Sequence, residues 1–163
     1  MTRKVVVIMG SKADRVTGEA IKATLGQFGI PCSLRIASAH KAPAYLLQML
    51  EAYEASGEVG VYITVAGRSN ALSGLVDAQV AAPVVACPPL SEPFAAQDVF
   101  SSLRMPSGVC PAVVLEPANA ALLAAKMLAV ADPDLRRAVE EHQARVREGI
   151  AKDDEALQGE KRV

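Results

Sequence analysis

The chain has 163 residues, of which 51% are hydrophobic and only 4% aromatic, and its formal net charge is -1. This length suits one domain with a single core of Ala, Val, Leu and Ile, a composition that favours helices packed on a sheet. The charge argues against a nucleic-acid partner, and there is neither a dense Lys/Arg block nor an apolar run near the roughly 18 residues of a membrane span. We therefore expect a soluble α/β protein with small-molecule partners, no nucleic acid and no membrane.

Five short runs rich in β-branched residues alternate with helical patterns, and each run predicts a strand. In chain order, strands are expected at Lys4–Met9, Cys32–Ser38, Val59–Ala66, Pro83–Cys87 and Pro111–Leu115. Helices are expected at Asp14–Phe28, Pro43–Ala55, Asn70–Val80, Ala95–Leu103 and Pro117–Ala131. This alternation predicts a doubly wound parallel sheet covered on both faces, a three-layer αβα sandwich.

The composition changes at Asp132, so residues 1–131 form the body and residues 132–163 a charged C-terminal helix of the same domain. The last 32 residues hold nine Asp or Glu and seven Lys or Arg. An apolar stripe recurs there at helical spacing: Leu135, Val139, His142, Val146, Ile150 and Leu157. The stripe favours contact with a neighbouring subunit over packing on its own domain, and His142 is interpreted as a packing residue.

The three cysteines, Cys32, Cys87 and Cys110, are widely spaced and form no CxxC pair, and no signal peptide is expected. A reducing, cytoplasmic location is expected. Because no neighbouring residue indicates metal ligation or activation of a nucleophile, we interpret all three as small buried hydrophobic side chains. No metal is predicted.

Ligands of doubly wound sheets bind beyond the carboxyl ends of the strands. The segments there are Gly10–Asp14, Ala39–Pro43, Gly67–Asn70 and the chain from Pro88 onwards. Charges are scarce in the body, yet four follow the first three strands: Lys12, Asp14, Lys41 and Arg68. These charges predict a polar rim around one pocket.

The first of these segments, "MGSKAD", joins a strand to a helix through a glycine turn. Backbone N–H groups, the Ser11 hydroxyl and the helix dipole would form an anion-binding site suited to phosphate. The segment matches neither the dinucleotide-binding glycine motif nor the P-loop, and Asp14 fits the simpler role of a helix N-cap equally well.

The second segment, "RIASAHKAPAYL", contains His40, the only histidine of the body. An imidazole takes up and returns a proton near neutral pH, so His40 is a candidate general acid and base. The alternative is a capping or core histidine at a strand end. Lys41 beside it favours a nearby anion, or is a solvated side chain.

The third segment, "TVAGRSNALSG", places small residues where a backbone approaches a ligand. Its alternative is an ordinary turn with Ser69 or Asn70 as N-cap. The stretches "CPPLSEPF" and "SSLRMPSG" are interpreted as rigid walls that fold over the pocket.

Together, "VVVIMGSKAD", "GIPCSLRIASAHKAP", "VAGRSNALSG", "ACPPLSEPFAAQDVFSSLRMPSG" and "LEPANAALLAAKMLA" resemble the phosphoribosylaminoimidazole carboxylases of purine synthesis, the PurE family, from about Val5 to Ala131. The chain looks like the second class, which uses carbon dioxide directly. It reads SAHK where the mutase class has SAHR, and Ala71 occupies the place of that class's second histidine.

The resemblance implies a flavodoxin-like sandwich in a symmetric homo-oligomer, a tetramer or octamer, with sites at subunit contacts. It implies reversible carboxylation of 5-aminoimidazole ribonucleotide by carbon dioxide to the 4-carboxy product, with no ATP, biotin, metal or other cofactor. A mutase moving a carboxyl group from the exocyclic nitrogen is the alternative, and a non-catalytic nucleotide-binding module is a further one.

Site residues follow from the same resemblance, position by position. His40 would be catalytic and Ser38 would border the imidazole ring, while Ser11 and Lys41 would hold the phosphate and Asp14 the ribose. The turn of Gly67, Arg68, Ser69 and Asn70 would enclose carbon dioxide, and Ser107 and Gly108 would lie near the ribonucleotide. The family's first loop usually carries a serine where this chain has Ala13, so a hydroxyl donor to the phosphate is missing there and Lys12 is a candidate substitute.

Overall fold

Five parallel strands form one central sheet in the order β2-β1-β3-β4-β5. The computed structural model describes residues 3–90 and 92–160. The strands are β1 Lys4–Met9, β2 Cys32–Ile36, β3 Val59–Val65, β4 Val84–Ala86 and β5 Ala112–Val113. This strand order is that of flavodoxin-like sandwiches, so the predicted fold class is confirmed.

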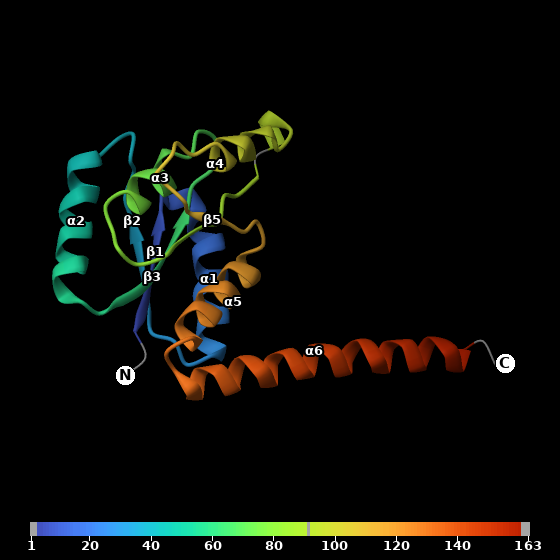
Figure 1. Ribbon diagram of the computed structural model, residues 1–163. Coiled ribbons are helices and arrows are strands. Elements are labelled where there is room, and N and C mark those ends of the chain that lie inside the picture. Colours follow the sequence, from blue (N-terminus) through green and yellow to red (C-terminus); the bar gives the residue numbers. More distant parts are fainter. Residues whose placement is uncertain (1–2, 91, 161–163) are drawn as a thin grey trace.

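Helices cover both faces of the sheet (Figure 1). The helices α1 Arg15–Gln27 and α5 Pro117–Ala129 pack on one face, and α2 Pro43–Ser56 and α3 Ala71–Asp77 on the other. Because side chains alternate along a strand, β1 contributes to both layers of the core: Val5, Val7 and Met9 lie in the first, and Val6 and Ile8 in the second.

The segment that follows β4 is less regular than predicted. A helix was expected over Ala95–Leu103, but α4 covers only Phe100–Leu103, after the 3-10 turns η2 Glu92–Phe94 and η3 Gln97–Val99. Ala95 and Ala96 have positive φ angles of 46° and 61°, and this left-handed backbone is incompatible with a continuous helix.

The C-terminal helix α6 spans Pro133–Glu160 and projects from the domain (Figure 1). Asp132 Oδ1 accepts a hydrogen bond from the Leu135 amide at 3.0 Å, which caps its first turn. Leu135 and Val139 are buried in the core, and the His142 ring lies edge-on to Phe28 at 5.3 Å. Only the first half of the apolar stripe therefore packs on its own domain.

The three cysteines differ in exposure. Cys87 is buried and Cys32 half-buried, but Cys110 is exposed, so the expectation of burial is wrong for Cys110. Cys110 lies in the surface segment before β5, where its amide donates to Asp77 Oδ2 at 2.7 Å. Cys110 is therefore held by a backbone hydrogen bond and not by packing of its side chain.

We expect these cysteines to differ in reactivity towards a thiol-specific disulfide reagent at pH 8. Burial raises the pKa of Cys87 to about 12 and that of Cys32 to about 11, so their thiolate fractions are on the order of 10⁻⁴ and 10⁻³. Absorbance of the released thiol should report one fast equivalent, Cys110, in the folded protein and three in denaturant. Fast labelling of Cys87 before unfolding would contradict this.

Within residues 3–90 and 92–160, none of the helices combines the length and the apolar character that crossing a bilayer requires.

Candidate active site

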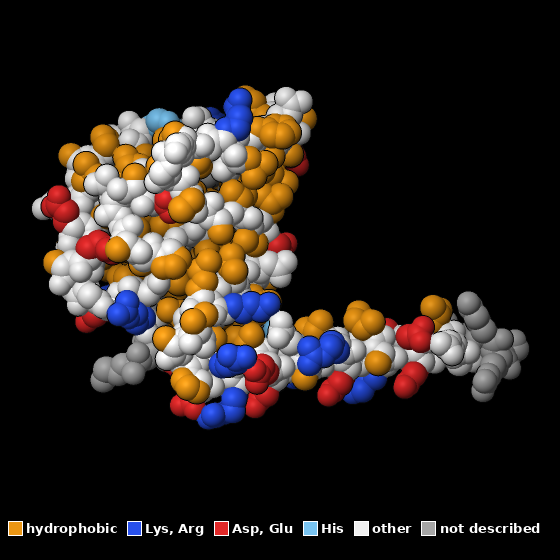
Figure 2. Space-filling view, in the orientation of Figure 1, with side chains coloured by type: hydrophobic (Ala, Val, Ile, Leu, Met, Phe, Trp, Pro, Cys, Tyr) orange, Lys and Arg blue, Asp and Glu red, His pale blue; other side chains and the backbone are white. Residues whose placement is uncertain are grey.

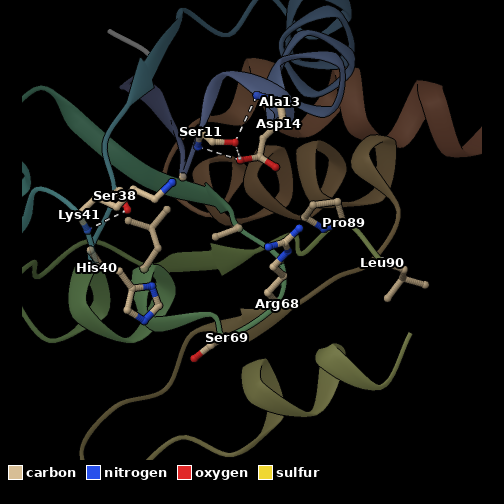
Figure 3. A pocket seen from close by; sticks show the side chains of 15 residues that line it. Ser11, Ala13, Asp14, Ser38, His40, Lys41, Arg68, Ser69, Pro89 and Leu90 are labelled. Atoms are coloured by element: carbon tan, nitrogen blue, oxygen red, sulfur yellow. Dashed lines mark hydrogen bonds between the residues drawn. The ribbon is translucent and has the colours of Figure 1, made fainter. Parts of the chain in front are cut away.

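A cavity of about 410 Å³ opens where the first four strands end at their carboxyl edge (Figure 3). Each loop that follows one of these strands contributes to its lining. The lining residues are Gly10, Ser11, Ala13 and Asp14 after β1; Ser38, Ala39, His40 and Lys41 after β2; Ala66, Gly67, Arg68, Ser69 and Leu72 after β3; and Pro89 and Leu90 after β4. The cavity lies at the switch point of the sheet, between β1 and β3, where doubly wound folds bind ligands.

The first loop is held by a capping box between Ser11 and Asp14. Asp14 Oδ2 accepts from the Ser11 amide at 2.9 Å and from the Ser11 hydroxyl at 3.0 Å, and Ser11 Oγ accepts from the Ala13 amide at 3.2 Å. Both interpretations of Asp14 thus have support, because it closes a helix start and also lines the cavity. The two bonds from Ser11 both go to Oδ2 of Asp14, so Asp14 Oδ1 is the oxygen that can accept from a ligand hydroxyl.

The second loop carries the candidate acid and base. Ser38 Oγ accepts from the Lys41 amide at 3.2 Å, and the Ser38 carbonyl accepts from the Ala42 amide at 3.0 Å. These bonds form a turn before α2, in which His40 and Lys41 are exposed. Figure 3 shows the His40 ring on the wall of the cavity, with Ser69 near it and Ser11 and Asp14 farther along. An imidazole in this place can exchange a proton with a bound ligand.

The third loop turns sharply at Gly67 and Arg68. A Cβ atom at Gly67 would lie 2.8 Å from the carbonyl oxygen of Pro89, so only glycine fits there without a shift of backbone. Arg68 has a φ angle of 59°, a left-handed conformation that is uncommon outside glycine. The backbone of this loop forms a close wall of the cavity.

Asn70 faces inwards and is only 4% exposed. Its Oδ1 accepts from the Ser73 amide at 3.2 Å and the Ser73 hydroxyl at 3.0 Å. The alternative interpretation, that Asn70 caps the helix after the turn, therefore describes its contacts.

The structure brings eight of the eleven predicted site residues to one cavity: Ser11, Asp14, Ser38, His40, Lys41, Gly67, Arg68 and Ser69. Asn70, Ser107 and Gly108 do not line it. Ser107 and Gly108 are exposed in a turn after α4, where Gly108 has a φ angle of 88°. Lys12, expected in the polar rim, is exposed outside the lining.

Sequence reasoning predicted the segments that hold the apolar part of the lining but singled out none of its residues, which are Ala39, Ala66, Leu72, Pro89 and Leu90. Leu72 follows the predicted turn by two residues, and position in the fold was the only signal that could have indicated it. Among the described residues, no three His, Cys, Asp or Glu side chains gather into a possible metal site.

The profile of the AIR carboxylase family matches residues 4–149, which is most of the chain and includes every loop of the cavity. The chain belongs to the AIR carboxylase family. The predicted resemblance to this family is confirmed.

Individual members of the AIR carboxylase family are similar over nearly the full length. A protein of Archaeoglobus fulgidus named phosphoribosylaminoimidazole carboxylase is 51% identical over 94% of this chain and 84% of its own length. A protein of the same name from Treponema denticola is 47% identical over 94% and 96%. The crystal structure of Treponema denticola PurE, 47% identical, covers 94% of this chain and 97% of that one with a TM-score of 0.92.

Proposed function

We propose that this cavity catalyses the reversible carboxylation of 5-aminoimidazole ribonucleotide by carbon dioxide, without ATP, in purine biosynthesis. The product is the 4-carboxy ribonucleotide. One observation carries the proposal: His40 shares a cavity with the Ser11–Asp14 capping box and the tight Gly67–Ser69 turn, in a family whose similar members are named phosphoribosylaminoimidazole carboxylase.

The chemistry needs positioning and one proton transfer. The ring carbon beside the amino group is electron-rich and attacks carbon dioxide once the two are held together away from water. The carbon then carries both the new carboxylate and its original proton. His40 removes that proton to restore aromaticity, and it returns the proton in the reverse decarboxylation.

Binding of the ribonucleotide is assigned to the first two loops. Lys41 and Ser11 hold the phosphate, Asp14 binds the ribose hydroxyls, and Ser38 borders the ring. Because the Ser11 hydroxyl donates to Asp14 in the structure, it can donate to a phosphate only after it turns away from that carboxylate. When phosphate binds, Asp14 Oδ2 therefore loses the hydrogen bond from the Ser11 hydroxyl and keeps the one from the Ser11 amide. This oxygen is then more available to accept from a ribose hydroxyl.

The test is a two-substrate assay with purified protein. With aminoimidazole ribonucleotide and bicarbonate, and no ATP, the carboxylated product should form at a rate that saturates with dissolved carbon dioxide. Turnover only with the N-carboxylated ribonucleotide would assign the mutase reaction instead. If the ribonucleotide binds but neither substrate is turned over, the protein is a non-catalytic nucleotide-binding module.

The carboxylase class is supported by two residues that differ from the mutase pattern. Ala71 is the first residue of α3, where the mutase class has its second histidine, and Lys41 replaces an arginine. With a single imidazole at the cavity, His40 has to serve the one proton transfer of direct carboxylation. No cofactor or metal takes part in this scheme.

We also propose a cytoplasmic homo-oligomer, a tetramer or octamer, assembled partly through α6. Beyond the domain, Val146, Ile150 and Leu157 are 55%, 67% and 54% exposed. Figure 2 shows apolar side chains along the upper edge of this helix. Ser107 and Gly108, outside their own chain's cavity, are assigned to the cavity of a neighbouring subunit.

Replacing Ile150 by Asp is expected to weaken this assembly, because a carboxylate would be buried in the contact. Light scattering coupled to size exclusion should show a loss of oligomer mass at micromolar concentration. Lys152→Asp, which introduces the same carboxylate at another exposed position of α6, is the control and should keep the wild-type mass. A monomeric wild type, or an unchanged Ile150→Asp oligomer, would contradict the assignment.

A further inference from the structure

The turn Gly67–Asn70 is held from behind by the segment 97–102, which has no place in the mechanism so far. Asp98 Oδ2 accepts a hydrogen bond from the Arg68 amide at 3.1 Å. Ser101 Oγ accepts from the Asn70 amide at 3.0 Å and lies 2.8 Å from the carbonyl oxygen of Arg68. Two side chains thus bind three polar groups of the turn's backbone, the amide and the carbonyl of Arg68 and the amide of Asn70.

The same segment also fixes the far end of the turn. The Asn70 amide group donates to Ser102 Oγ at 2.9 Å, and both side chains are buried. Asn70 Oδ1 binds Ser73 in α3. The cap of α3 is therefore linked directly to α4, a short helix about thirty residues away in the sequence.

Packing alone gives the middle of the turn little support, because it lies between two cavities. Arg68 and Ser69 line the candidate active site and also a second cavity of about 750 Å³. That second cavity is bordered on its other side by Gln97, Asp98, Ser101 and Arg104. Both residues are exposed, and Arg68 has the unfavourable positive φ angle of 59°. A strained turn persists only where its surroundings hold it, and here hydrogen bonds do so.

We propose that Asp98 and Ser101 are positioning residues that keep the Gly67–Asn70 turn in the conformation that encloses carbon dioxide. They do not line the candidate active-site cavity, and act through the backbone of Arg68 and Asn70. The role in catalysis rests on the proposed function. The role in holding the turn is independent of it.

The two side chains stabilise the turn in different ways. Asp98 fixes the direction of the Arg68 amide, and with it the left-handed conformation. The Ser101 hydroxyl has one proton, shared between the carbonyl oxygens of Arg68 and Asp98, both 2.8 Å away, so it ties the turn to the segment that carries Asp98. Loss of either side chain should free the same short stretch of backbone.

The experiment compares Asp98→Ala, Asp98→Asn and Ser101→Ala with wild type, and uses Gln97→Ala, an exposed neighbour in the same segment, as the matched control. The first readout is amide hydrogen exchange of the peptide that covers Gly67–Asn70. The second is steady-state kinetics with carbon dioxide and the ribonucleotide varied separately, alongside the calorimetric Kd of the ribonucleotide. Thermal denaturation verifies that each variant is folded.

Asp98→Ala and Ser101→Ala should speed exchange in this peptide about tenfold and raise the KM for carbon dioxide about tenfold, with the ribonucleotide Kd changed by less than about twofold. Asp98→Asn retains an acceptor oxygen and should restore both values most of the way. Gln97→Ala should match wild type.

Exchange and carbon dioxide kinetics that stay at wild-type values in folded Asp98→Ala and Ser101→Ala would overturn the proposal. So would an equal rise in the KM of both substrates, which indicates general loosening. If wild type itself forms no product, the proposed function fails, and the exchange data alone then decide whether Asp98 and Ser101 hold the turn.

Discussion

Replacing His40 by Asn is expected to reduce carboxylation by about 10²- to 10⁴-fold, the usual contribution of a general acid and base. The ribonucleotide should still bind with nearly its wild-type Kd, because His40 is exposed on the cavity wall and binding of the phosphate and ribose is assigned to other residues, Ser11, Lys41 and Asp14. The measurement pairs the initial rate with titration calorimetry. Exchange of the ring proton with solvent should fall with the rate.

His142→Asn is the matched control, since it changes the chain's other histidine. His142 packs on Phe28 and does not line the cavity. Turnover of this variant should equal that of wild type. Unchanged turnover in His40→Asn would remove His40 from the mechanism, and a Kd weakened as much as the rate would make it a binding residue.

Replacing Gly67 by Ala is expected to reduce carboxylation by about 10²-fold, because a shift on the order of 1 Å in a positioning loop has effects of that size. The new methyl group would lie 2.8 Å from the Pro89 carbonyl oxygen, and backbone on one side or the other must move. The turn and the loop after β4 then separate. Initial rates at saturating ribonucleotide, with carbon dioxide varied, measure the effect.

Gly26→Ala is the control for Gly67→Ala. Gly26 lies in α1 with open space where its Cβ would be, so this change should leave the rate unchanged and raise the free energy of unfolding by up to about 1 kcal/mol. Wild-type kinetics in Gly67→Ala would show that the turn tolerates displacement, and would contradict its assignment as a close wall.

The sheet was predictable because its strands are continuous apolar runs with clear ends. The run of Val and Ile within Lys4–Met9 forms β1, and Val5 to Met9 are buried on both faces, as a central parallel strand requires. The segment 95–103 was not predictable in the same way. Alanines favour helix locally, yet Ala95 and Ala96 have left-handed backbone. In the same segment, Asp98 and Ser101 make tertiary contacts with the distant turn at Arg68, which local sequence does not indicate.

The candidate site was predictable where it depends on polar residues at strand ends. Few charges occur in the body, so Asp14, Lys41 and Arg68 marked the loops that converge on the cavity. Leu72 and Leu90 carry no chemical signal of their own. Leu90 lies in the proline-rich stretch predicted to form a pocket wall, whereas only the fold places Leu72 in the lining. Asn70 shows a third case, in which the local pattern allowed two roles and the buried contacts with Ser73 indicate the capping one.

The decarboxylation of the 4-carboxy ribonucleotide in heavy water tests the central claim most directly, because it follows the proton that His40 is proposed to deliver. Wild type should release aminoimidazole ribonucleotide with deuterium at the ring carbon, faster than the buffer blank, and His40→Asn should not. Mass spectrometry of the product gives the answer. Decarboxylation no faster than the blank with wild type, or equally fast deuteration by His40→Asn, would contradict the account.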